Sequence, residues 1–157
     1  CALYFEQQGQ YFSIFDPNKS RIIYVCSQEL GRDLSFIAAI NAEYVIDASK
    51  EPEEHYYTQT PGRRTRSLSG VIHCVKLLLG CTGDVVIYCR HGRTRSPVIV
   101  AAYLMIVSCL SQAAAYRYLS SAFNTQRPVH SAESIDREER YLGHLEDLRV
   151  LLENPSL

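Results

Sequence analysis

Short apolar runs separated by turn residues fill the first half of the chain, and longer apolar runs with helical spacing follow. Short runs rich in Tyr, Phe, Ile and Val predict β-strands. The first two runs are separated by Asp16, Pro17 and Asn18, which are typical turn residues. The predicted strands are residues 11–15, 22–25, 44–47 and 85–88.

Helices are predicted from the longer spacing of apolar residues and from the residues at the ends of each run. Gly80 is a suitable end for the second predicted helix. Ser111 and Ser131 are suitable N-caps for the last two. The predicted helices are residues 34–40, 71–79, 96–109, 111–123 and 132–152.

The order of these elements predicts the fold class. The segment 48–66 is polar and contains two prolines and a glycine, so we expect a long loop there. Strands interleaved with helices, followed by helices alone, are typical of an α/β fold with one sheet flanked by helices. No repeat or low-complexity stretch is present, and we expect a single domain over residues 1–157.

Composition and charge narrow the functional classes. A length of 157 residues suits one domain with a real core, and a net charge of −1 does not favour general binding to nucleic acid or membranes. No apolar run is long enough to span a bilayer. Six scattered cysteines do not fit a disulfide scaffold, and we expect a reducing compartment, the cytoplasm or the nucleus. The chain begins with Cys1 rather than Met, which is compatible with a fragment and leaves upstream targeting segments open.

The segment Cys-Arg-His-Gly-Arg-Thr-Arg-Ser, from Cys89 to Ser96, carries the candidate chemistry. It places a cysteine at the end of a buried strand and Arg95 where a helix begins. Loop N–H groups and a helix N-terminus attract an anion, and the same field favours an ionised thiol. Arg95 adds a planar fork that can bind two oxygens of a tetrahedral anion. The segment therefore predicts a thiolate that faces a bound phosphate.

The spacing Cys-x5-Arg-Ser, with Gly92 in the middle, resembles the phosphate loop of the cysteine-based phosphatases. The order of the flanking elements from about residue 22 to the C-terminus resembles the dual-specificity phosphatases within the protein tyrosine phosphatase superfamily. This resemblance implies a central, mostly parallel β-sheet flanked by α-helices. It also implies dephosphorylation of phosphotyrosine, phosphoserine or phosphothreonine in a protein substrate, with no metal and no cofactor.

The resemblance also implies roles for individual residues. Cys89 is expected to attack phosphorus and form a phosphocysteine intermediate, and Arg95 to stabilise the transition state. Ser96 is expected to assist departure of the thiolate in the second step. The remaining residues of the loop are expected to bind the phosphoryl group: Arg90, His91, Gly92, Arg93 and Thr94.

Two positions depart from the family pattern. Most members have His directly before the cysteine, where this chain has Tyr88. The family's general acid is an Asp in the loop before the helix that precedes the cysteine strand, and residues 48–67 contain no Asp. The acid candidates in that stretch are Glu51, Glu53, Glu54 and His55.

The basic loop leaves a second class of substrate open. Lipid phosphatases of the phosphatase-and-tensin type carry basic residues at the positions of Arg90 and Arg93, and RNA triphosphatases of the capping type carry a pair that matches His91 and Gly92. A polyanion such as a phosphoinositide or an RNA 5′ end is therefore an alternative substrate. Three arginines of the preceding loop are candidates for the rim of the same pocket: Arg63, Arg64 and Arg66.

Two other classes of function are compatible with parts of the same sequence. A pseudophosphatase would keep the anion site and bind phosphorylated peptides without turnover. The Tyr-Cys-Arg-x-Gly pattern also resembles the active loop of rhodanese-type sulfurtransferases, but this loop is one residue longer, which favours phosphate. The cysteines and histidines lack the paired short spacings of a metal site.

Overall fold

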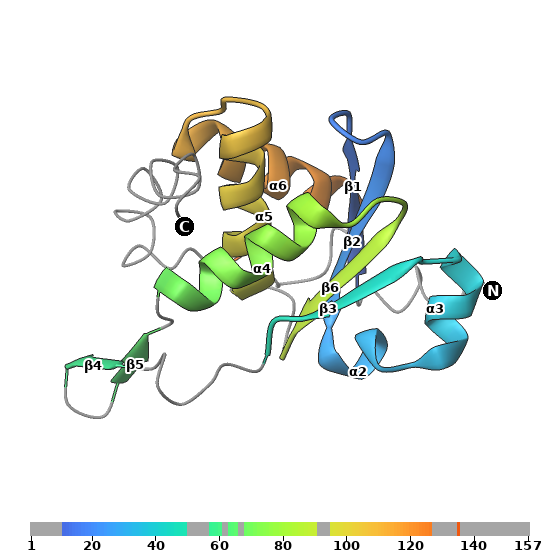
Figure 1. The fold of residues 1–157 in the computed structure, drawn as a ribbon, viewed down its shortest axis with the longest axis horizontal. Helices are drawn as coiled ribbons and strands as arrows, with labels where there is room; N and C mark the ends of the chain where they lie inside the picture. Colours follow the sequence, from blue (N-terminus) through green and yellow to red (C-terminus); the bar gives the residue numbers. More distant parts are fainter. Residues whose placement is uncertain are drawn as a thin grey trace.

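A computed structural model describes residues 11–49, 57–60, 63–65, 68–90, 95–126 and 135 (Figure 1). Its central sheet has the strand order β1-β2-β6-β3. β1 pairs antiparallel with β2, and β6 pairs parallel with both β2 and β3. The sheet is therefore mostly parallel, as predicted. Its strands are β1 (Tyr11–Asp16), β2 (Arg21–Ser27), β3 (Tyr44–Asp47) and β6 (Val85–Cys89).

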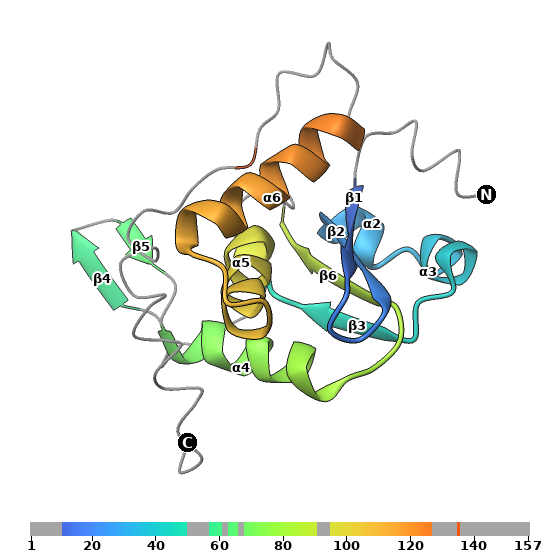
Figure 2. The ribbon, with the colours of Figure 1, turned by 90° about the horizontal axis from the view of Figure 1, so that it is seen from above.

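Helices cover both faces of this sheet, which confirms the predicted α/β class (Figures 1 and 2). One face is covered by the three longer helices, α4 (Leu68–Gly80), α5 (Arg95–Val107) and α6 (Gln112–Gln126). The other face is covered by two short helices, α2 (Gln28–Gly31) and α3 (Leu34–Ile40).

Strand β6 is buried along its whole length because it lies between these two layers. Its side chains alternate between the faces, as the period of a strand requires. Ile87 and Cys89 belong to the larger core, which includes residues of α4, α5 and α6. Tyr88 belongs to the smaller core, with Leu30 of α2 and Phe36 of α3. Cys89 and Tyr88 therefore lie on opposite faces of the sheet.

The carboxyl ends of β2, β3 and β6 lie side by side at one end of the sheet. Ser27, the last residue of β2, pairs with Cys89 at the end of β6. Asp47, the last residue of β3, pairs with Tyr88. Because these strands are parallel, their carboxyl ends bring residues from distant parts of the chain to the place where α5 begins.

Helix α3 has the boundaries that its sequence predicts. The Asp33 carboxylate accepts a hydrogen bond from the Ser35 amide at 2.8 Å, which satisfies a donor of the first turn. Asn41 adopts a left-handed conformation, with φ of 55°, at the other end. The predicted strand over 44–47 is confirmed as well.

Helices α5 and α6 differ slightly from their predicted limits. α5 ends at Val107, before Cys109, which has a left-handed φ of 52°. The Ser111 hydroxyl accepts from the Ala114 amide at 3.1 Å, as expected of an N-cap. α6 extends to Gln126, whose side-chain amide bonds both backbone groups of Ser13 in β1, at 2.7 and 2.6 Å. This contact supplies hydrogen bonds to the edge of the sheet and explains the extra helical turn.

Two other predictions need correction. The expected loop over 48–66 contains a two-stranded sheet, β4 (Tyr57–Thr60) and β5 (Arg63–Thr65), on either side of Pro61 and Gly62. Helix α4 begins at Leu68 rather than at residue 71, so Gly70 lies inside the helix and does not precede it. Helix α2 was not predicted. The helix predicted over 132–152 lies outside the described residues except for Ile135, which is not in a helix and packs against the larger core.

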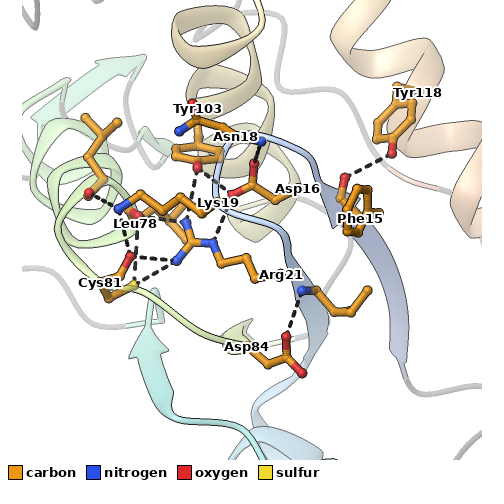
Figure 3. Close-up of polar contacts among 12 residues, drawn as sticks. Phe15, Asp16, Asn18, Lys19, Arg21, Leu78, Cys81, Asp84, Tyr103 and Tyr118 are labelled. Atoms are coloured by element: carbon orange, nitrogen blue, oxygen red, sulfur yellow. Dashed lines mark hydrogen bonds and ion pairs between the residues drawn. The ribbon is translucent and has the colours of Figure 1, made fainter.

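At the end of the sheet opposite the start of α5, a buried polar cluster connects the β1–β2 turn to helices α4 and α5 (Figure 3). Arg21 donates from Nε to the Asp16 carboxylate at 2.9 Å, and both side chains are almost completely buried. The Tyr103 hydroxyl of α5 also donates to Asp16. The other donors of Arg21 reach the carbonyl oxygens of Leu78 and Cys81, at 2.8 and 2.9 Å, where α4 ends. The cluster thus fixes α4 and α5 relative to the sheet.

Candidate active site

Cys89 is placed by the sheet directly in front of helix α5. Its side chain is 2% exposed. The backbone N–H of Ser96, in the first turn of α5, points at the Cys89 sulfur with an N–Sγ distance of 3.5 Å. A helix N-terminus carries partial positive charge, so this geometry stabilises negative charge on the sulfur.

Arg95 is the first residue of α5. A cation at this position is disfavoured by the helix dipole unless it meets acceptors or an anion. Its Nη1 atom donates to the backbone carbonyl of Ser49 at 3.0 Å. Ser49 lies two residues beyond β3, so the contact joins the arginine to the carboxyl end of a neighbouring strand.

Ser96 is completely buried. Within the described part of the chain, its hydroxyl has no hydrogen-bond partner. The same residue donates its backbone N–H to Cys89. Burying a hydroxyl without a hydrogen-bond partner costs free energy. We therefore expect the Ser96 hydroxyl to find an acceptor near the Cys89 sulfur when a substrate is bound.

Tyr88, which stands where most family members have His, packs tightly against helix α2. A Cβ atom on Gly31 would lie 2.4 Å from the Tyr88 ring, so only glycine allows this approach. The Arg32 guanidinium lies over the ring, 5.7 Å from its centroid. Arg32 also donates from Nε to the Tyr88 hydroxyl at 3.4 Å. The tyrosine thus takes part in a contact network of its own, on the face opposite Cys89.

Asp47 is the acidic member of that network. Its carboxylate accepts from the backbone N–H and the hydroxyl of Ser49, at 2.9 and 2.5 Å, and lies 3.8 Å from the Arg32 guanidinium. Burial raises the pKa of Asp47, but the bonds from Ser49 and Tyr88 and the charge of Arg32 outweigh it, so that its pKa is lower than usual. Asp47 is therefore an ionised acceptor at neutral pH and is poorly suited to act as a general acid.

Arg90 begins the loop, and its backbone is held from the other side of the site. Its carbonyl accepts from the Gln28 amide at 3.4 Å, and its side chain is exposed. The other predicted phosphate-binding residues, His91, Gly92, Arg93 and Thr94, lie outside the described residues. The acid candidates Glu51, Glu53, Glu54 and His55 lie outside them as well, as do Arg66 and the side chains of Arg63 and Arg64.

Cys26 is a second thiol close to the site. It is completely buried on β2, beside Tyr88. Burial, and to a smaller extent the neighbouring Cys89, raises the pKa of the Cys26 thiol. Cys26 therefore stays protonated at neutral pH and is not a competing nucleophile.

The described residues hold no sign of a metal centre or of a membrane-spanning helix. They include no cluster of three or more His, Cys, Asp or Glu side chains arranged to hold a metal ion. None of the helices described here is both long enough and apolar enough to cross a membrane.

Comparison with known families decides what kind of domain this is. The sequence model for the dual specificity phosphatase catalytic domain matches residues 23–145. The chain belongs to this family. Membership of the dual specificity phosphatases supports a cysteine-based phosphatase, that is, a hydrolase. It leaves the sulfurtransferase interpretation without support. The comparison with curated protein sequences gave no match.

Solved structures confirm the fold of this phosphatase domain. It is similar to a leucine-rich repeat and phosphatase domain containing protein from Entamoeba histolytica, with 17% identity, coverage of 94% of this chain and 95% of that one, and a TM-score of 0.63. For human DUSP28 the identity is 19%, the coverage 91% and 95%, and the TM-score 0.55. For PTPMT1 in complex with PI(5)P the identity is 16%, the coverage 93% and 99%, and the TM-score 0.58.

The structure brings together several residues that the sequence prediction included and some that it missed. Cys89 lies at the end of β6, and Arg95 and Ser96 lie in the first turn of α5, where the Ser96 N–H points at the Cys89 sulfur. Arg32, Asp47 and Ser49 were missed because they come from different segments. A signal for two of them exists: Asp-x-Ser that begins at the last residue of a predicted strand is typical of a turn in which the Asp accepts the Ser amide.

Proposed function

We propose that this domain hydrolyses phosphate monoesters through a phosphocysteine formed on Cys89. The observation that carries the proposal is the Ser96 N–H directed at the Cys89 sulfur from the N-terminus of α5. A thiolate held in this way is both stabilised and placed where a helix terminus attracts a phosphate. Phosphorylated protein is the first substrate class that we propose, in a reducing compartment such as the cytoplasm.

In the first step, the Cys89 thiolate attacks phosphorus. The S–P bond forms, the P–O bond to the leaving group breaks, and the leaving oxygen takes up a proton. Arg95 and the loop amides bind the phosphoryl oxygens, and the arginine stabilises the charge of the transition state. In the second step, water attacks phosphorus, the S–P bond breaks, and the thiolate and inorganic phosphate are released. The Ser96 hydroxyl donates a hydrogen bond to the departing sulfur.

The proton for the leaving oxygen comes from a group other than Asp47, because that carboxylate is ionised and bonded to Ser49. We propose one of Glu51, Glu53, Glu54 and His55. General acid catalysis is typically worth about 10²–10⁴-fold. An alkyl phosphate needs this protonation more than an activated aryl phosphate does. The ratio of the two hydrolysis rates therefore measures how effective the general acid is.

The experiment uses a small aryl phosphate and three proteins: wild type, Cys89→Ser and Arg95→Ala. Turnover should vanish in Cys89→Ser, while inorganic phosphate still binds. Arg95→Ala should lose about 10²–10³-fold in kcat and should bind phosphate weakly. Turnover that survives in Cys89→Ser would contradict the proposal. Phosphate binding without turnover in wild type would favour the pseudophosphatase alternative.

Arg90 supports a second substrate class, a polyanion such as a phosphoinositide. Its side chain is exposed next to the nucleophile, and its backbone is fixed by Gln28. The structure of PTPMT1 named above contains PI(5)P. If this class is correct, Arg90→Ala should reduce kcat/KM on a phosphoinositide far more than on a simple aryl phosphate. Equal losses on both would contradict it. An RNA 5′ end can be tested with the same variant.

A further inference from the structure

We propose that Asp47 and Ser49 are positioning residues for Arg95. This inference rests on the proposed function, because it assigns Arg95 to the binding of phosphate. It adds two residues that lie outside the phosphate loop and that reach the loop from the neighbouring strand β3.

The chain turns sharply directly after β3. Asp47 accepts both the amide and the hydroxyl of Ser49. These two bonds bend the backbone directly after the strand and hold Ser49 by both its amide and its side chain, which limits where its carbonyl can lie. The amide of the intervening residue, Ala48, donates to the carbonyl of Tyr88 at 2.8 Å, which keeps the turn against β6.

This turn places the Ser49 carbonyl in contact with Arg95. The Ser49 carbonyl accepts from Nη1 of Arg95 at 3.0 Å. An arginine has five donors in a planar fork, so one contact from the protein restricts its rotamer and leaves other donors for the oxygens of a phosphate. Holding the guanidinium before the substrate arrives lowers the entropy lost on binding.

Asp47 is itself held by Arg32, which also contacts Tyr88. Arg32 lies 3.8 Å from the second carboxylate oxygen of Asp47 and also donates from Nε to the Tyr88 hydroxyl at 3.4 Å. Tyr88 is in turn held by its packing against Gly31. A continuous set of contacts therefore leads from α2 and Tyr88, through Arg32, Asp47 and Ser49, to Arg95. In this chain, the tyrosine before Cys89 supports the phosphate-binding arginine from the opposite face of the sheet.

The test measures binding of tungstate, a tetrahedral oxyanion, by calorimetry in the Cys89→Ser background. Asp47→Ala should weaken tungstate binding by about ten-fold, as expected for the loss of a positioning hydrogen bond to a charged group. Asp47→Asn should stay within about two-fold of the parent, because its amide oxygen still accepts the Ser49 N–H. In the Arg95→Ala background, Asp47→Ala should cause no further loss.

Asp33→Ala is the matched control. Asp33 also accepts an amide two residues ahead, that of Ser35 at 2.8 Å, but it has no contact with Arg95 among the described residues. It should lower stability without changing tungstate binding. If Asp47→Ala does not fold, Ser49→Ala replaces it, with an expected loss of about three-fold that again disappears without Arg95.

Two results would overturn the inference: tungstate binding unchanged in folded Asp47→Ala, or an equal loss with and without Arg95. Neither depends on turnover. If wild-type protein shows no Cys89-dependent hydrolysis but the coupling between Asp47 and Arg95 is found, the proposed function fails and the positioning role stands. If hydrolysis is found without the coupling, the reverse holds.

Discussion

Replacing Asp16 by Asn is the sharpest test of how the fold is held together. The Asp16 carboxylate is completely buried and accepts from Arg21 Nε at 2.9 Å and from the Tyr103 hydroxyl (Figure 3). The substitution keeps the shape of the side chain and removes its charge. Arg21, with a side chain only 1% exposed, is then a buried cation without a counter-ion.

The expected loss follows from this geometry. Breaking a buried ion pair by removing one partner typically costs about 3–5 kcal/mol. We expect the lower end of that range, about 3 kcal/mol, because Arg21 keeps the carbonyl oxygens of Leu78 and Cys81 as acceptors. Tyr103→Phe removes one hydroxyl and leaves the ion pair, so its expected cost is about 1.5–3 kcal/mol. Against a typical total of about 5–15 kcal/mol, either loss is easily measured.

Urea denaturation at neutral pH gives the free energy of unfolding of each variant. Asp33→Asn is the control, since that side chain lies at the surface and its amide can still cap α3; its change should stay within about 0.5 kcal/mol. The double variant Asp16→Asn with Arg21→Met should lose less than the sum of the two single changes. A loss below about 1 kcal/mol for Asp16→Asn, with an unchanged urea slope, would show that the buried ion pair does not hold the fold together as described.

Three further predictions concern the surroundings of the site. Gly31→Ala should displace the Tyr88 ring and destabilise the fold by about 1–3 kcal/mol in urea denaturation. Gly80→Ala is the control and should not be destabilising, because a Cβ there meets no atom within 4 Å. Equal losses in the two variants would contradict the tight packing of Gly31 against Tyr88. Because the pKa of Asp47 is lowered, its ionised form stabilises the fold above about pH 4 and that contribution is lost as the pH falls through and below this value. The stability difference between wild type and Asp47→Asn should therefore shrink in acid, and a constant difference would count against the ionised network. Cys26 should resist iodoacetamide in the native protein at neutral pH and react after unfolding, as read by mass spectrometry of the peptides; rapid native labelling would show that it is not buried.

Local signals account for the parts of the fold that the sequence predicted well. Asp33 and Asn41 mark the ends of α3, and the boundaries there agree. The run before Cys89 is apolar without interruption because β6 is buried on both faces. Helix α2, by contrast, is a single turn with no apolar period. It is fixed by tertiary contacts, the burial of Leu30 and the packing of Gly31 under Tyr88, which no local pattern shows.

The same distinction applies to the candidate site. Cys89, Arg95 and Ser96 lie within one short segment, so their spacing alone places them at a strand end and a helix start. The partners of Tyr88 come from α2 and β3, and only the pairing register of the sheet brings Asp47 beside it. The departure at Tyr88 was visible in the sequence, but its contacts with Arg32 and Asp47 were not.

Acid-quenched trapping of a phosphoenzyme would show directly whether Cys89 is the nucleophile. Wild-type protein is mixed with a small aryl phosphate, quenched within the first turnovers, digested and analysed by mass spectrometry. The account predicts one phosphoryl group on the peptide that contains Cys89, formed in a burst together with the released phenol, and none in Cys89→Ser. Turnover without a phosphorylated Cys89, or a phosphoryl group on another residue, would contradict it.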